Sequence, residues 1–130
     1  EGVNFMPHCA ELLRVLHGRV KVFILTNGDT YAQERRIEKS GFAPYFDGVF
    51  ISEQLGCKKP EKAFYDKVFS LIGEEYRGCT LMVGDSLSSD MQGGRNAGIP
   101  TCFYGKREKA DARCDYVIED LLELPPLLGI

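Results

Sequence analysis

The chain has 130 residues, of which 44% are hydrophobic and 27% are charged, an ordinary composition for one globular domain. Its net charge of −3 excludes a strongly basic nucleic-acid surface, and no apolar run approaches the ~20 residues of a membrane span. The five cysteines include no C-x-x-C pair, which argues against a zinc site and favours free thiols in a reducing cytoplasm.

Short apolar runs alternate with amphipathic stretches along the chain. Continuous apolar runs are typical of strands that are buried on both faces, and helices separate such strands in parallel sheets. In chain order, the pattern predicts a helix over 6–17, a strand over 19–26, a helix over 30–40, a strand over 47–52, a helix over 60–72, a strand over 79–84, a helix over 88–97, and strands over 100–105 and 115–118. This alternation predicts an α/β fold, a Rossmann-like parallel sheet with flanking helices.

The ends of these helices carry local signals. Thr30 and Gln33 have the spacing of a capping box, and Pro60 stands at the favoured first position of a helix. Glycines follow the predicted helices as C-terminal caps, at positions 18, 41, 73 and 98.

Sheets of this kind bind ligands outside the carboxyl ends of their strands. Three such ends carry polar residues: "TNGD" (26–29), "CKKP" (57–60) and "GDSLSSD" (84–90). We expect the three loops to converge on one crevice.

The first two loops contain groups suited to an anion such as phosphate. Thr26 offers a hydroxyl and Asn27 a side-chain amide, and the turn at Gly28 is expected to expose backbone N–H groups. Lys59 precedes Pro60 and therefore stays outside the helix, where its ammonium can neutralise a phosphoryl oxygen and a neighbouring carboxylate.

The third loop has two interpretations. Gly-Asp-Ser-Leu is typical of a family of serine esterases, in which Ser86 would be the nucleophile. Such a serine needs a base, usually a histidine. His8 and His17 both precede Ser86 in the sequence and suit surface positions at helix ends. Alternatively, Asp85 at the strand end and Asp90 in the next helical turn hold Mg²⁺, one directly and one through its second shell. An alternative also stays open, in which Asp85 only forms the turn and Asp90 only places a favourable charge at the N-terminus of the helix.

Together these motifs resemble those of the haloacid dehalogenase superfamily, in its phosphatase-like branch with a helical cap. The similar segments are "ILTNG", "KKPEKAFY" and "VGDSLSSDMQGGRNAGI", in the order that the family has, with "GFAPYFDGVFISEQLG" and "DYVIEDLLELPPLL" as connecting segments. The dehalogenase members carry Ser-Ser-Asn where this chain has "GDS", which favours phosphatase over dehalogenase chemistry.

The resemblance implies a role for each site residue. Thr26, with Asn27 and Gly28 beside it, would bind the transferring phosphoryl group, and Lys59 would stabilise charge on that group and on the nucleophile. The metal residues would be Asp85, as a ligand of Mg²⁺, and Asp90, as a ligand or as a partner of the metal's waters. The implied reaction is hydrolysis of a small phosphorylated metabolite through an aspartyl-phosphate.

The family's first motif, Asp-x-Asp, has no counterpart here. The aspartates stand at 29, 47, 66, 85, 90, 111, 115 and 120, so no two are spaced by two, and the cap that the family inserts before its second motif is absent as well. We therefore expect residues 1–130 to be a partial core domain, a truncated or proteolytic piece of a longer protein, and inactive alone. A rival hypothesis is a non-catalytic fragment that binds metal and phosphate or serves as an association module.

In the family, the strand that bears the nucleophile lies between the strands that end here at Thr26 and Gly84. Without it, both strands have unpaired edges, which invite association. We expect the two strands to pair directly, another chain or copy to fill the gap, or a longer parent protein to supply the strand. The cap selects the substrate in this family, so phosphosugar, nucleotide and phosphoglycolate all remain open.

Overall fold

The computed structural model describes residues 7–130, so Met6, where the first predicted helix begins, lies outside the described residues. Contacts divide the chain into two compact units. Unit 1 comprises residues up to 54 together with 120–130, and unit 2 comprises 55–119. Both units are built from parallel strands and flanking helices, so the predicted α/β fold class is confirmed.

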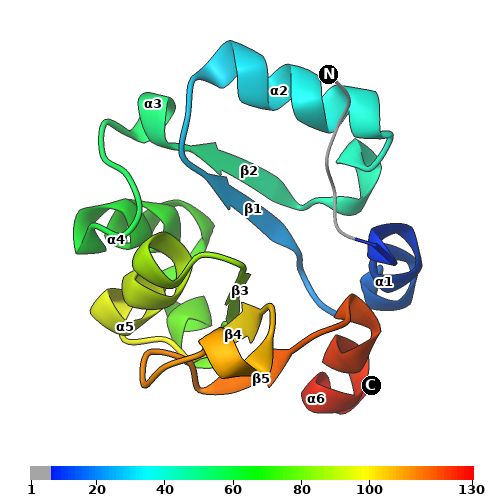
Figure 1. Ribbon diagram of the computed structural model, residues 1–130. Helices are drawn as coiled ribbons and strands as arrows, with labels where there is room; N and C mark the ends of the chain where they lie inside the picture. The colour runs from blue at the N-terminus through cyan, green and yellow to red at the C-terminus, as the bar shows by residue number, and fades with distance from the viewer. Residues whose placement is uncertain (1–6) are drawn as a thin grey trace. The chain divides into compact units, whose positions relative to one another are not determined.

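Unit 1 contains a two-stranded sheet and the helices around it (Figure 1). Its elements are α1 (Cys9–Leu16), β1 (Phe23–Thr26), α2 (Thr30–Ser40), the 3₁₀ helix η1 (Ala43–Tyr45), β2 (Gly48–Ile51), the start of α3 (Ser52–Leu55), the 3₁₀ helix η5 (Leu121–Glu123) and α6 (Leu124–Leu128). In the parallel ladder, Phe23 lies opposite Gly48 and Thr26 lies opposite Ile51. Both strands therefore end at the same edge of the sheet.

Unit 2 contains a three-stranded parallel sheet in the order β3-β4-β5. Its elements are α4 (Lys62–Ile72), the 3₁₀ helix η2 (Glu74–Cys79), β3 (Met82–Gly84), the π-helical turn η3 (Leu87–Met91), α5 (Gln92–Ala97), β4 (Thr101–Tyr104), the 3₁₀ helix η4 (Arg107–Lys109) and β5 (Tyr116–Ile118). Gly84 lies opposite Phe103, so the loop after β3 starts at the carboxyl edge of this sheet.

Every observed strand lies within a predicted range, because the apolar runs and the turn signals that bound them marked the strands in the sequence. Between residues 7 and 130, however, β1 pairs with β2 alone and β3 with β4 alone. How the open edges of the strands that end at Thr26 and Gly84 are completed, for which the sequence left three outcomes open, stays a prediction.

Each unit buries its own apolar residues. In unit 1 they include Leu12, Leu13, Leu16, Ile37, Ile51, Leu121 and Leu124. In unit 2 they include Phe64, Val68, Phe69, Met82, Met91, Cys102 and Phe103. Full burial of one such side chain stabilises a fold by about 1.5–3 kcal/mol relative to exposure.

Two helices begin differently from the prediction. The N-cap of α2 is Asp29, whose Oδ1 accepts from the N–H of Ala32 at 2.8 Å, and Thr30 is already helical, so the expected capping box is wrong. Helix α4 begins at Lys62 because Glu61 is extended, with ψ of 131°, and Pro60 therefore lies in the preceding turn. Among the predicted C-terminal caps, Gly41 follows α2 in the left-handed region, with φ of 77°.

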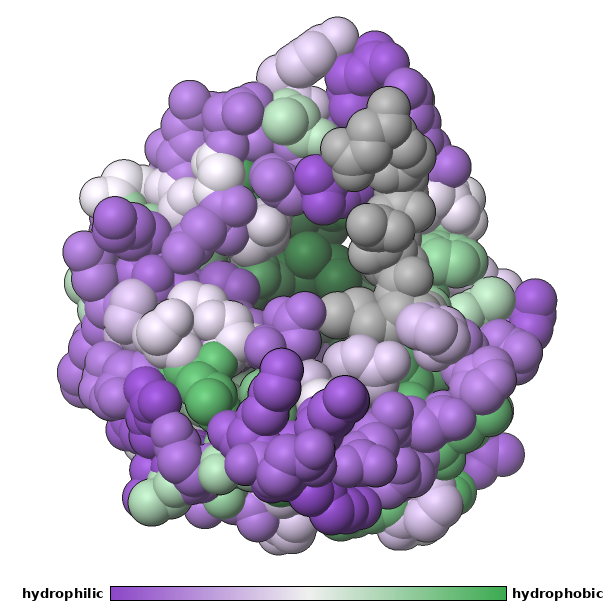
Figure 2. Space-filling view, viewed as in Figure 1, coloured by the Kyte–Doolittle hydropathy of each residue, from purple (hydrophilic) through white to green (hydrophobic). Residues whose placement is uncertain are grey.

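No helix within residues 7–130 is long and apolar enough to cross a lipid bilayer. The face shown in Figure 2 is dominated by hydrophilic residues. The five cysteines are free thiols, as the sequence predicts.

Candidate functional site

The loop after β1 is organised around the hydroxyl of Thr26. Its Oγ lies 3.2 Å from Oε1 of Gln33 and 3.2 Å from the carbonyl oxygen of Asn27, and it donates to one of them at a time. The Gln33 side chain lies over Gly28, where an added Cβ would come 2.6 Å from Nε2. Gly28 has φ of 141°, a backbone conformation that favours glycine.

Two residues that directly follow β2 bond to the same loop. The N–H of Gly28 donates to Oγ of Ser52 at 2.9 Å, and the N–H of Thr30 donates to Oε1 of Glu53 at 2.6 Å. These two amides are therefore not the exposed donors that the sequence led us to expect at this turn. Ser52 and Glu53 carried no signal in the sequence, because their role depends on the pairing of β1 with β2.

Lys59 and Asp90 form a buried ion pair. Nζ of Lys59 lies 2.7 Å from Oδ1 of Asp90, and the side chains are 11% and 8% exposed. Oδ2 of Asp90 accepts from the N–H of Ser86 at 3.2 Å. Both carboxylate oxygens of Asp90 thus have hydrogen-bond partners. The predicted motifs at 57–60 and 84–90 therefore contact each other.

The Asp90 carboxylate lies against the end of β3. A Cβ added to Gly84 would lie 2.2 Å from Oδ2 of Asp90, so only glycine leaves room for the carboxylate there. Asp85 follows Gly84 directly and is exposed, and within residues 7–130 its side chain has no hydrogen-bond partner. An exposed carboxylate thus begins the loop that also bears a buried one.

Asp85 and Asp90 are the candidate residues for a Mg²⁺ site. Between residues 7 and 130, no group of three or more His, Cys, Asp or Glu side chains is placed to hold a metal ion. Magnesium, however, usually keeps several waters and takes one or two protein carboxylates. Asp85 as a direct ligand, with Asp90 outside the first shell because its oxygens have partners, fits that habit. The metal role of both residues stays a prediction.

The turn that carries Asp90 is a π-helical turn. The N–H of Met91 donates to the carbonyl of Ser86 at 3.0 Å, which closes the wider ring, and Oγ of Ser86 accepts from the N–H of Ser89 at 3.1 Å. Single π turns are frequent at functional sites. Ser86 therefore serves as the N-cap of the turn that presents Asp90.

Tyr65 of α4 supports this turn from inside unit 2. Its side chain is 0% exposed, and its hydroxyl donates to the carbonyl oxygen of Ser89 at 3.4 Å. Burial, with a smaller contribution from the Asp90 carboxylate, raises the pKa of Tyr65 far above its usual range. The sequence gives no signal of the hydroxyl's partner, because the contact depends on how α4 packs.

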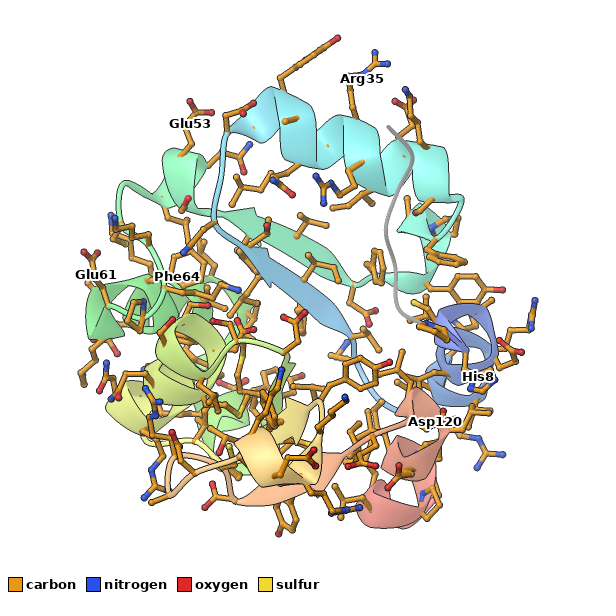
Figure 3. All side chains as sticks on the ribbon, viewed as in Figure 1. His8, Arg35, Glu53, Glu61, Phe64 and Asp120 are labelled. Atoms are coloured by element: carbon orange, nitrogen blue, oxygen red, sulfur yellow. The ribbon has the colours of Figure 1, made fainter. Side chains whose placement is uncertain are left out.

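The esterase interpretation of Ser86 requires a histidine base, and both histidines have other partners. Nδ1 of His8 lies 2.8 Å from Oδ1 of Asp120 (Figure 3), and His17 packs edge-on against Tyr45 with ring centroids 5.4 Å apart. Both lie at the ends of α1, as predicted. No serine–histidine pair is formed in the part of the chain that is described.

The structure brings some of the predicted site residues together. Lys59 contacts Asp90 in unit 2, which also contains Asp85. Thr26, Asn27 and Gly28 form one loop of unit 1. The convergence of all three loops on one crevice stays a prediction.

Comparison with known proteins gives consistent matches. Residues 3–98 match the family model described as haloacid dehalogenase-like hydrolase. The chain is 37% identical over 126 residues to the pyrimidine 5'-nucleotidase YjjG of Escherichia coli (strain K12), a match that covers 95% of this chain and 56% of that protein. It is 49% identical over 83 residues to the pyrimidine 5'-nucleotidase PynA of Streptococcus pneumoniae (strain ATCC BAA-255 / R6), covering 64% of this chain and 35% of that protein.

A solved structure is also similar over almost the whole chain. The putative HAD-hydrolase YfnB from Bacillus subtilis, in a crystal structure bound to magnesium, superposes with a TM-score of 0.92 at 33% identity. The superposition covers 99% of this chain and 58% of that one. The chain thus spans about half the length of the curated relatives it matches.

Proposed function

This chain belongs to the haloacid dehalogenase-like hydrolases, and from that premise we propose that it is part of a Mg²⁺-dependent phosphatase that acts on a small phosphorylated metabolite. The observation that carries the proposal is the buried contact of 2.7 Å between Lys59 and Asp90, which are 31 residues apart in the sequence. Lys59 supplies a positive charge. Asp90, together with the exposed Asp85 of the same loop, supplies the carboxylates that phosphoryl transfer requires.

In the proposed reaction an aspartate carboxylate attacks phosphorus, the ester oxygen leaves as an alcohol, and water then hydrolyses the aspartyl-phosphate to free phosphate. The Thr26 hydroxyl would turn from Gln33 to donate to a phosphoryl oxygen, and the Lys59 ammonium would stabilise charge on the phosphoryl group and on the nucleophile. No two aspartates of these 130 residues have the Asp-x-Asp spacing, so the nucleophile and the general acid would come from outside them.

The Mg²⁺ ion would be held by Asp85 directly and by Asp90 through water. When bound, it would supply positive charge to the phosphoryl oxygens as the transition state forms. The magnesium bound to the similar YfnB structure supports the choice of Mg²⁺ as the metal. The "GDS" sequence at 84–86, in place of Ser-Ser-Asn, favours this chemistry over dehalogenation.

Among the substrate classes that the sequence left open, we propose a pyrimidine nucleoside monophosphate as the first to test, because two of the relatives are pyrimidine 5'-nucleotidases. We place the reaction in the cytoplasm, where the five free thiols remain reduced.

A second proposal concerns the sheet edges. Since β1 and β3 are edge strands of their sheets in the described part of the chain, we propose that the isolated chain self-associates through them or binds a segment that adds a strand. The non-catalytic alternative, a fragment that binds phosphate and metal without turnover, is favoured by the lack of an Asp-x-Asp pair.

The test measures phosphate release from uridine monophosphate and p-nitrophenyl phosphate with Mg²⁺. We expect no turnover by the 130 residues, and turnover once they are fused to a segment of this family that carries an Asp-x-Asp strand and a cap. Asp85→Asn should abolish that turnover, whereas the control Asp111→Asn, which affects a surface pair with Arg113, should not. Ordinary phosphatase turnover by the 130 residues alone, abolished by Asp85→Asn, would show that the nucleophile lies within them.

A further inference from the structure

The side chains of two residues that directly follow β2 hold the loop from Thr26 to Thr30. Ser52 accepts from the N–H of Gly28 at 2.9 Å, and its Oγ lies 3.3 Å from the carbonyl oxygen of Gly28. Glu53 accepts from the N–H of Thr30 at 2.6 Å (Figure 3). Two adjacent residues therefore fix the backbone on both sides of Asp29.

Strand register explains why these two residues reach the loop. Thr26 lies opposite Ile51 in the parallel ladder, so Asn27 and Ser52 leave their strands side by side. Ile51 is 1% exposed, and its burial fixes the register, because a shift by one residue would turn this side chain to the other face. The core of unit 1 thus determines where Ser52 and Glu53 lie.

Two carboxylates occupy the beginning of α2. Glu53 accepts from Thr30, the first residue of the helix, and Asp29 accepts from Ala32 at 2.8 Å. The first N–H groups and the dipole of a helix are what commonly bind an anion. In this chain, the carboxylates of Asp29 and Glu53 already accept hydrogen bonds at this end of the helix, where an anion would otherwise bind.

We propose that Ser52 and Glu53 are positioning residues of the loop that carries Thr26. They fix its backbone, and Glu53 acts as a built-in anion at the N-terminus of α2, so that a phosphoryl group is directed to the Thr26 hydroxyl and not to the helix. The directing role rests on the proposed function, whereas the contacts of Ser52 and Glu53 with the loop stand without it.

The first experiment follows backbone amides of the ¹⁵N-labelled 130-residue chain by NMR. The Thr30 amide should exchange slowly with solvent in the parent chain, because Oε1 of Glu53 accepts a hydrogen bond from it at 2.6 Å. Glu53→Gln should speed this exchange about tenfold, because the amide loses a charged acceptor, and the matched control Glu34→Gln on the exposed face of α2 should leave it unchanged. Ser52→Ala should speed solvent exchange of the Gly28 amide about tenfold or more.

Two results of this first experiment would overturn the proposal. One is Thr30 exchange that Glu53→Gln leaves unaltered, since another group would then protect this amide. The other is Gly28 exchange that Ser52→Ala leaves unaltered.

The second experiment adds inorganic phosphate to the same samples. In the parent chain, phosphate should shift the amides of Thr26 and Asn27 and leave Thr30 unchanged. In Glu53→Gln, phosphate should bind at Thr26 about tenfold more weakly and should newly shift Thr30, whereas Glu34→Gln should behave as the parent.

The outcomes separate the two proposals. If the parent chain binds no phosphate while the exchange of the Thr30 amide still depends on Glu53, the proposed function and the directing role fail, and the contact with the loop stands. If phosphate shifts Thr30 in the parent chain as strongly as Thr26, Glu53 does not exclude anions from the helix and the directing role is wrong.

Discussion

Nζ of Lys59 and Oδ1 of Asp90 lie 2.7 Å apart in a contact that leaves the two side chains only 11% and 8% exposed. Removing one member of a buried pair leaves the other charge uncompensated, which typically costs about 3–5 kcal/mol. We therefore expect Lys59→Met to lower the free energy of unfolding by about 3 kcal/mol in urea titrations, and Lys59→Met/Asp90→Asn to recover most of that loss. A double variant no more stable than Lys59→Met would contradict this account of the pair.

Gly84 is required by the position of Asp90. A Cβ there would lie 2.2 Å from Oδ2 of Asp90, so Gly84→Ala must displace the carboxylate from Lys59. We expect a loss of stability of about 1–3 kcal/mol in urea unfolding, typical of overpacking. The matched control is Gly78→Ala, where a Cβ meets nothing within 4 Å. Equal effects of the two substitutions would show that the space around Asp90 is not limiting.

The hydroxyl of Tyr65 is buried and donates to the carbonyl of Ser89 at 3.4 Å. Tyr65→Phe removes this hydrogen bond and keeps the aromatic ring. We therefore expect the free energy of unfolding to fall by about 0.5–1.5 kcal/mol in urea titrations. A loss of several kcal/mol would mean that the hydroxyl does more than join α4 to the π-helical turn.

Tyr65 also predicts sensitivity to alkali. Its pKa lies far above the ordinary value of 10.0 because of burial and, less, because of Asp90. Above pH 10.0 an unfolded chain ionises this residue while the folded chain keeps it protonated, so folding stability falls as pH rises. Tyr65→Phe should reduce that fall in unfolding experiments at alkaline pH, and an unchanged pH dependence would argue against a buried Tyr65 hydroxyl.

His8 and Asp120 join the start of α1 to the segment before η5, with 2.8 Å between Nδ1 and Oδ1. The hydrogen bond and the charge of Asp120, with a smaller effect of Glu11, raise the pKa of His8 above its ordinary 6.5. The N–H of Leu122 and then His8 lower the pKa of Asp120 below its ordinary 3.8.

The stabilising effect of this pair is therefore complete between pH 3.8 and 6.5. It is lost as pH rises through the raised pKa of His8, and as pH falls through the lowered pKa of Asp120. In an NMR titration of the imidazole, Asp120→Asn should return the pKa of His8 toward 6.5. The control Asp111→Asn should not move it, and an unshifted His8 in Asp120→Asn would mean that the pair does not form in solution.

The sequence predicted the order and type of the main elements because their signals are local. Apolar runs and turn residues located the five strands of residues 7–130 within the predicted ranges, and Gly41 ended α2 as expected. The first strand is shorter than predicted at its beginning, because Arg19 and Val20 still donate to the carbonyl of Leu16 and so belong to the turn after α1. Local patterns do not distinguish the last turn of a helix from an approaching strand.

The supporting contacts of the candidate site could not be predicted in the same way. Ser52 and Glu53 reach the Thr26 loop through strand register, and Tyr65 reaches Ser89 through the packing of α4 on the π-helical turn. The residue types of Lys59 and Asp90 suggested their roles, but their contact is a fact of tertiary structure. Only the fold determines such partners.

The register of β1 on β2 has a consequence for how unit 1 tolerates insertions and deletions. The connection between the strands includes the turn from 41 to 47, which is far from Thr26 in the sequence. A length change there that slid β2 by one position would expose Ile51 and carry Ser52 and Glu53 away from Gly28 and Thr30 together. A mutation in this remote turn would thus damage the core and release the Thr26 loop in a single event.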